Sequence, residues 1–142
     1  FDATLLAMAG LNRLEIKKNF RQIDKNIFVP AIGQGAIVAL VREEDTELKK
    51  KLSTISDKKT EIEVLCEREF MLALEGSCQT PIAGLALLKS VDGIEKIYFH
   101  YFVSTKFGEK IKKGIKVFDV KNALRLSYEF GKSLSKLVHG CL

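Results

Sequence analysis

Two predicted strands, 82–89 and 94–103, are joined through an Asp92-Gly93 pair, and this pattern constrains the fold more than any other part of the sequence. An Asp-Gly pair readily adopts the left-handed backbone that a tight hairpin turn requires. A third strand is predicted for residues 110–117, after a glycine turn. Three consecutive strands joined by short turns predict an antiparallel sheet.

Amphipathic helices are predicted on both sides of these strands. Residues 57–74 begin with Asp57, a good N-cap, and a final helix follows Asp119, which is another. The apolar residues at helical spacing in the two helices are Ile62, Leu65, Cys66, Phe70, Ala73, Ala123, Leu124, Leu126, Phe130, Leu134 and Leu137. Two helices that bury such faces against one sheet predict an α+β fold, with a C-terminal three-stranded antiparallel sheet covered by helices.

The first 55 residues are predicted to form elements that lack a sheet of their own. Asp2 can cap a first helix that ends near Arg13, and the sequence "EEDTELKKKLSTI" at 43–55 predicts a second helix. Between them, the apolar run at 36–41 predicts a strand. Such a strand is normally buried among other strands, so its partners are expected outside this chain. Because the sequence opens on Phe1 without an initiator Met, we expect a fragment or a processed product.

The net charge of +5 permits a nucleic-acid-binding module, although the lysines are spread thinly over polar faces and turns. The run "IYFHYF" at 97–102 contains aromatic rings on which bases could stack. Successive residues of a strand point to opposite faces, so at least one set of these rings belongs to the core. A small basic α+β nucleic-acid-binding module is therefore the alternative hypothesis, and the main interpretation includes no nucleic-acid partner.

The three cysteines, Cys66, Cys78 and Cys141, show no metal-ligand spacing, and the two histidines are isolated. This pattern predicts no metal site and a reducing compartment, which indicates the cytoplasm. The apolar stretches are far shorter than the roughly 20 residues of a membrane helix, so no membrane partner is expected.

Cys78 lies in "LEGSCQTP", a polar loop that opens on Gly76, the residue expected to end the preceding helix in a left-handed conformation, and closes on Pro81. Most cysteines of soluble proteins are buried, so Cys78 is either an accident of an exposed loop or a reactive thiol. The negative end of the helix would raise the pKa of this thiol, which disfavours repeated thiolate catalysis. A thiol alkylated once by a strong electrophile needs only access and room.

A second glycine-bearing segment, "GQGA" at 33–36, is either a plain turn or a place where the backbone approaches a ligand. In the second case Gln34 would offer amide contacts. Arg13 and Arg68 stand apart from the lysines, because a planar guanidinium holds carboxylates in a fixed geometry.

Three segments, "DATLLAMAGLNRL", "VPAIGQGAIVAL" and "EREFMLALEGSCQTPIAG", together resemble the carboxy-terminal half of the porphobilinogen deaminase (hydroxymethylbilane synthase) family, in the same order and spacing. The likeness is strong over residues 1–88 and rests on the order of elements beyond them. In this family the cysteine of an L-E-G-G-C-x-x-P-I segment carries a dipyrromethane cofactor through a thioether bond. Here Ser77 stands in place of the second glycine.

The resemblance implies that Cys78 captures a pyrrole azafulvene, a strong electrophile, and then holds the cofactor. Arg13 matches a carboxylate-binding arginine of the family, and Arg68 matches the arginine ahead of the cofactor loop. A structural ion pair is an equally good interpretation of Arg68. The cofactor-binding residues implied are Cys78, Arg13, Gln34, Gly35, Gly76 and Ser77.

The resemblance also implies a transferase of tetrapyrrole (haem) biosynthesis that joins four porphobilinogen units with loss of ammonia. Its partners would be porphobilinogen, the oligopyrrole intermediates and the missing amino-terminal half, which holds the family's catalytic aspartate. Residues 1–30 would end the family's second domain and residues 31–55 would return to its first domain, and both would be α/β remnants of these two domains. Residues 56–142 would form its third, cofactor-carrying domain. Alone, the chain is expected to be inactive and prone to self-association.

Overall fold

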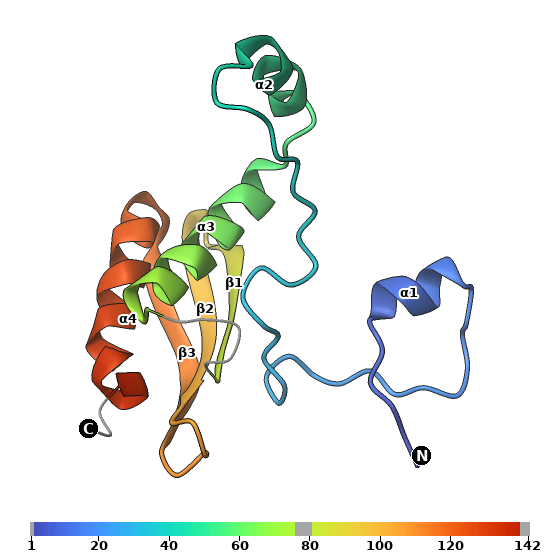
Figure 1. Cartoon of the computed structure of the whole chain (residues 1–142), viewed down its shortest axis with the longest axis vertical. Coiled ribbons are helices and arrows are strands. Elements are labelled where there is room, and N and C mark those ends of the chain that lie inside the picture. Colours follow the sequence, from blue (N-terminus) through green and yellow to red (C-terminus); the bar gives the residue numbers. More distant parts are fainter. Residues whose placement is uncertain (1, 76–80, 140–142) are drawn as a thin grey trace.

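The computed structural model describes residues 2–75 and 81–139. Two long helices cover one face of a three-stranded sheet, while an extended segment that carries two short helices runs away from this body (Figure 1). The elements in chain order are α1 (Met8–Arg13), α2 (Thr46–Ser53), α3 (Lys58–Ala73), β1 (Ile82–Val91), β2 (Ile94–Ser104), β3 (Ile111–Asp119), a 3-10 turn (Val120–Asn122) and α4 (Ala123–His139). The predicted α+β architecture is confirmed.

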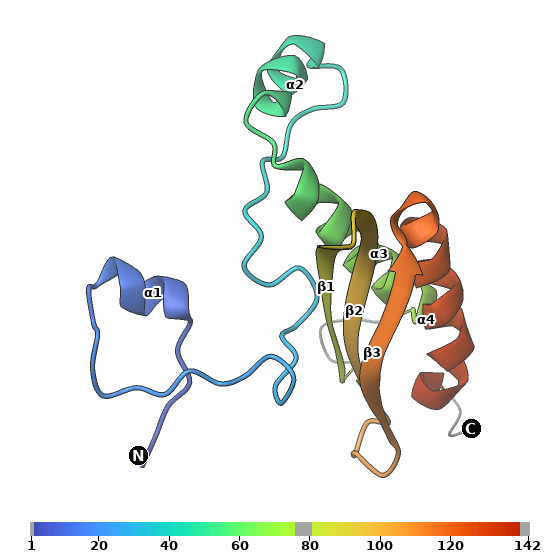
Figure 2. The same cartoon turned by 180° about the vertical axis from the view of Figure 1, so that it is seen from behind.

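The sheet has the strand order β1-β2-β3, and both strand pairs are antiparallel. The predicted hairpin turn is confirmed, because Asp92 and Gly93 both have positive φ angles, of 52° and 75°. This conformation suits the right-handed twist of the two strands that it joins. From behind, the face of the sheet opposite to α3 and α4 is visible (Figure 2).

The core lies between this sheet and the two long helices. Its centre is aromatic: the rings of Phe70 and Phe99 have centroids 4.9 Å apart, and Phe70 lies 5.6 Å from Phe130. Tyr101 adds an edge-on contact with Phe130 at 4.9 Å. Each such pair contributes about 0.5–1.5 kcal/mol beyond the burial of its area, so these rings tie α3, α4 and β2 together.

The two caps predicted for the helices that flank the strands are confirmed. The Asp57 carboxylate accepts the Thr60 N–H at 2.6 Å, and this capping hydrogen bond is the main reason that the pKa of Asp57 is lowered. The Asp119 carboxylate accepts the Lys121 N–H at 2.9 Å and starts the 3-10 turn that leads into α4.

One set of the 97–102 rings belongs to the core, as the alternation predicts. Ile97 and Phe99 are fully buried, and Tyr101 is half-buried against the core. On the opposite face His100 is also buried, while Tyr98 and Phe102 are half-buried. No finding favours the nucleic-acid alternative.

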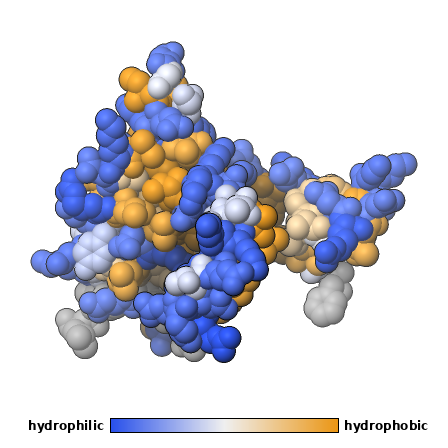
Figure 3. Space-filling view, turned by 90° about the horizontal axis from the view of Figure 1, so that it is seen from above, coloured by the Kyte–Doolittle hydropathy of each residue, from blue (hydrophilic) through white to orange (hydrophobic). Residues whose placement is uncertain are grey.

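The first 55 residues correct two predictions. The first helix begins at Met8 and not near Asp2, because residues 2–7 have nothing to pack against and Leu11 is the buried residue of α1. Residues 36–41 form no strand, because nothing in the described ranges 2–75 and 81–139 pairs with them: Ile37 and Leu40 are 102% and 94% exposed. The predicted second helix is confirmed as α2. Figure 3 shows hydrophobic residues at the surface of both the main body and the lobe around α1.

Candidate functional site

One buried carboxylate joins the glycine loop, which we define as residues 31–36, to α3 and β1. Glu67 is 5% exposed, and its Oε2 accepts the Gly33 N–H at 2.7 Å. Its Oε1 accepts the Ala86 N–H at 2.9 Å. Burial raises the pKa of Glu67, although the two backbone hydrogen bonds act in the opposite direction. A single side chain thus connects three segments that are far apart in the sequence.

Other N–H groups on the outer edge of β1 also donate hydrogen bonds to acceptors outside the sheet. The Gly84 N–H donates to the Pro30 carbonyl at 3.0 Å, and the Leu88 N–H donates to Glu63 Oε1 at 2.7 Å. Together with Ala86, these are three alternate N–H groups of one strand edge, each with an acceptor outside the sheet. The segment before the glycine loop is therefore held directly along β1.

The glycine loop itself is a turn that depends on its two glycines. Gly33 and Gly35 have φ angles of 68° and 89°, in the left-handed region where a side chain would strain the backbone. Gln34 is exposed, and its Oε1 accepts the Ala31 N–H at 3.3 Å. The turn is confirmed, whereas ligand contacts from Gln34 and Gly35 stay a prediction.

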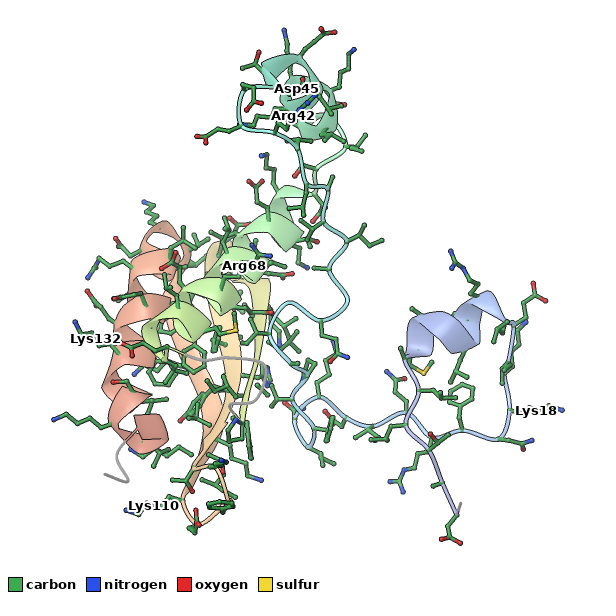
Figure 4. The ribbon with its side chains drawn as sticks, viewed as in Figure 1. Lys18, Arg42, Asp45, Arg68, Lys110 and Lys132 are labelled. Atoms are coloured by element: carbon green, nitrogen blue, oxygen red, sulfur yellow. The ribbon has the colours of Figure 1, made fainter. Side chains whose placement is uncertain are left out.

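An open cavity of about 770 Å³ lies beside this loop, between the extended segment, α2 and α3. The structure brings Gly35 and Arg68 together on its wall, and Arg68 is exposed on α3 (Figure 4). Within residues 2–75 and 81–139, Arg68 makes no ion pair, so the structural ion-pair interpretation gains no support there. Other lining residues include Val38, Lys49, Leu52 and Val64. The cavity therefore combines apolar walls with charges of both signs, because Asp57 and the Lys58–Glu61 ion pair line it as well.

Arg13 lies elsewhere. It is the last residue of α1, it is exposed, and α1 stands apart from the sheet in both ribbon views (Figures 1 and 2). The structure of this chain does not bring Arg13 to the cavity that Gly35 and Arg68 line, and its role stays a prediction.

The loop that contains Cys78 gave the strongest sequence signal, and the structure describes only its two ends. Gly76, Ser77 and Cys78 lie outside the described residues. Glu75, which follows the C-cap residue Leu74, has a left-handed φ of 50°, while the prediction of a left-handed Gly76 lies outside the described residues. Cys66 is fully buried, as predicted, and burial raises the pKa of its thiol. A buried thiol of this kind is unsuited to alkylation.

Glu63 and Glu67 were missed by the sequence analysis. A signal was present, because both occur at helical spacing with Phe70 and Leu74, on the stripe of α3 that faces the core. Carboxylates in an apolar stripe need hydrogen-bond donors. Here the donors are backbone N–H groups of a strand edge and a loop, which no local pattern identifies.

Neither a membrane helix nor a metal cluster is found in the part of the chain that the structure describes. No helix there is long and apolar enough to cross a membrane. No three His, Cys, Asp or Glu side chains there are grouped so that they could hold a metal ion.

Two family models match the chain in succession. Residues 1–50 match the model described as "Porphobilinogen deaminase, dipyromethane cofactor binding domain". Residues 61–138 match the model described as "Porphobilinogen deaminase, C-terminal domain". The second match alone covers more than half of the 142 residues.

Curated relatives named "Porphobilinogen deaminase" agree with these matches. The protein of Bacillus mycoides (strain KBAB4) is 46% identical over 97 residues, which is 67% of this chain and 31% of the relative. The protein of Halalkalibacterium halodurans is 43% identical over 119 residues, which is 81% of this chain and 37% of the relative. The chain thus spans about a third of the length of the relatives that it matches.

Proposed function

This chain belongs to the porphobilinogen deaminase family, and from that membership we propose that it forms the carboxy-terminal part of a hydroxymethylbilane synthase. The observation that carries the proposal is the order of the two family matches, 1–50 followed by 61–138. The complete enzyme would be a cytoplasmic transferase that joins four porphobilinogen units with loss of ammonia. The remainder of such an enzyme would supply the catalytic aspartate, so this chain alone is expected to be inactive.

We propose that Cys78 is the covalent anchor of the dipyrromethane cofactor. Its thiol would add to the exocyclic methylene carbon of an azafulvene, which forms from an aminomethylpyrrole by loss of ammonia, so that a C–S bond forms, the thiol proton passes to the ring nitrogen and the pyrrole ring is restored. Dipyrromethane, once bound, supplies the primer on which the pyrrole chain grows. Cys66 is an unsuitable anchor because it is fully buried in α3.

The described residues fit such a group. The cavity of about 770 Å³ is within the usual range of small-molecule sites, and its apolar walls suit pyrrole rings. Pyrroles of this class carry acetate and propionate groups, and Arg68, which makes no ion pair with any residue that the structure describes, offers its guanidinium to such a carboxylate. Gly35 and Gln34 would add backbone and amide contacts from the glycine loop. Arg13 would reach the site once α1 is held by the remainder of the enzyme.

The remainder of the enzyme is also the proposed partner of the exposed apolar segment. Ile37 and Leu40 project from extended backbone without a strand beside them. Strands of the family's first domain would pair with residues 36–41 and cover these side chains. Without that partner, the same surface favours self-association. The domain boundaries at residues 30 and 55 belong to this proposal.

The test is peptide mass mapping of a complete enzyme that carries this sequence. The pyrrole adduct is expected on the peptide that contains Cys78, and Cys78→Ser is expected to abolish it, since a serine hydroxyl is a far poorer nucleophile than a thiol. Cys66→Ser and Cys141→Ser serve as matched controls and should retain the adduct. An adduct on either control cysteine, or one that persists in Cys78→Ser, would contradict the proposal.

A further inference from the structure

We propose that Glu67 is a positioning residue, which fixes the glycine loop against β1 and thereby sets the place of Gly35 relative to Arg68. This inference rests on the proposed function only for its consequence in the enzyme. We call the two hydrogen bonds from the Gly33 and Ala86 N–H groups to Glu67 the clamp, and both of them lie within this chain.

The first observation is that Glu67 uses both carboxylate oxygens, each for a different segment. Oε2 holds Gly33, which is 34 positions away in the sequence, and Oε1 holds Ala86, which is 19 positions away. No cation pairs with this carboxylate among the residues that the structure describes. A buried carboxylate without a counter-ion is costly, so its two N–H donors are what stabilise it there.

The second observation is the contrast with Glu63, one helical turn earlier on α3. Glu63 uses Oε1 alone to hold the Leu88 N–H of β1, at 2.7 Å. A helix-to-strand connection therefore needs a single oxygen. The second oxygen of Glu67 has a separate partner, the glycine loop, and this partner distinguishes the two carboxylates.

The third observation is that the loop is fitted to β1 around the Gly33 contact. Pro30 accepts the Gly84 N–H at 3.0 Å. The Ile32 side chain lies over Gly84 so closely that a Cβ at this glycine would be 2.5 Å from Ile32 Cδ1. Pro30 is thus hydrogen-bonded to β1, and the Gly33 N–H is hydrogen-bonded to Glu67. Gly35, two residues later, lines the same cavity as Arg68.

The consequence is geometric. Glu67 and Arg68 are consecutive on α3, yet one is buried against β1 and the other is exposed at the cavity. Because Glu67 anchors the loop to the helix that carries Arg68, it fixes the spacing between the loop backbone and the guanidinium. A site that binds carboxylates through both would depend on that spacing.

Glu67→Gln, with Glu63→Gln as its matched control, tests the clamp by amide hydrogen exchange of the 142-residue chain. A Gln side chain has one acceptor oxygen, so it can serve Leu88 at position 63 but cannot serve both Gly33 and Ala86 at position 67. Ala86 is held by the sheet as well, so the loop is the partner that will be lost. We expect exchange at Gly33 to accelerate at least about tenfold in Glu67→Gln and less than about twofold in Glu63→Gln.

A complete enzyme with the same two variants tests the positioning role. Glu67→Gln is expected to raise KM for porphobilinogen about tenfold with a smaller change in kcat, whereas Glu63→Gln should change KM less than about twofold. Unchanged exchange at Gly33, equal effects of the two variants, or faster exchange with an unchanged KM would each overturn the proposal. If the wild-type enzyme shows no turnover, the proposed function fails, and the exchange experiment still decides whether the clamp exists.

The wild-type chain provides a measurement that does not depend on the folding of a variant. An amide proton that donates to a carboxylate shifts when that carboxylate ionises. The NMR signals of Gly33 and Ala86 should therefore titrate with one common midpoint, because both N–H groups donate to the Glu67 carboxylate. Separate midpoints for Gly33 and Ala86 would overturn the clamp.

Discussion

Gly131→Ala should destabilise the protein, although alanine is the better helix former. Gly131 is buried on α4 where this helix crosses α3. A Cβ added there would be 2.6 Å from the Phe70 carbonyl oxygen and 2.9 Å from Ala73 Cβ. The carbonyl belongs to the backbone of α3 and cannot turn aside, so the two helices must move apart.

The magnitude follows from two opposing terms. Alanine gains about 1 kcal/mol over glycine in a helix interior. Forcing an extra methyl group into a packed contact costs about 1–3 kcal/mol. Since the shift also disturbs the ring contacts of Phe70 with Phe99 and Phe130, we take the upper part of that range and expect a net loss of about 1–2 kcal/mol.

Urea unfolding followed by circular dichroism measures this loss of unfolding free energy. In thermal unfolding, Tm should fall by about 4–8 °C for each kcal/mol lost. Gly10→Ala is the helical control, because nothing lies within 4 Å of a Cβ at Gly10. Gly84→Ala is the steric control: its Cβ would be only 2.5 Å from Ile32, yet it meets the flexible end of that side chain and should cost less. A neutral or stabilising Gly131→Ala, or a larger loss in Gly84→Ala, would refute the reasoning.

Three further predictions concern charge and exposed apolar surface. In a complete enzyme, Arg13→Leu should weaken substrate binding about tenfold or more, because a charge-assisted hydrogen bond is worth about 1.5–3 kcal/mol. Arg125→Leu, the control, removes only an exposed ion pair with Glu129 and should leave KM nearly unchanged. The pKa of Glu67 is raised in the folded state, so its titration contributes stability that is fully present below its ordinary pKa of 4.5 and is lost as pH rises through the raised value. Urea unfolding across this range should show wild-type stability falling relative to Glu67→Gln, and parallel curves would contradict the assignment. Leu40→Asp should reduce self-association of the isolated chain in sedimentation velocity, and an unchanged distribution would show that residues 36–41 are not the contact.

The three-stranded sheet and its two long helices could be predicted because their sequence signals are local. The Asp92-Gly93 turn fixes a hairpin, and Asp57 and Asp119 each mark a helix start by capping the next turn. Alternation along β2 correctly separated the buried residues Ile97 and Phe99 from the opposite face. Such features depend on a few neighbouring residues, so a single sequence contains them.

The conformation of residues 36–41 and the clamp could not be predicted, because both depend on residues that are distant in the sequence or outside this chain. Residues 36–41 have the composition of a strand, but a strand needs backbone partners, and the part of the chain that the structure describes supplies none. The role of Glu67 depends on Gly33 and Ala86, which tertiary folding brings to it from both directions along the sequence. The sequence could identify the glycine turn at Gly33 but not the carboxylate that holds it.

The occupied edge of β1 has a consequence for the behaviour of the protein in solution. Strand edges with free N–H groups are templates on which other chains aggregate, and here the alternate N–H groups of Gly84, Ala86 and Leu88 are all taken. The opposite edge is β3, whose sequence "IKKGIK" carries three lysines that repel a second copy of itself. The sheet is therefore a poor seed for cross-chain β-aggregation, and precipitation of this protein should begin in the extended segment around Ile37 and leave the sheet folded.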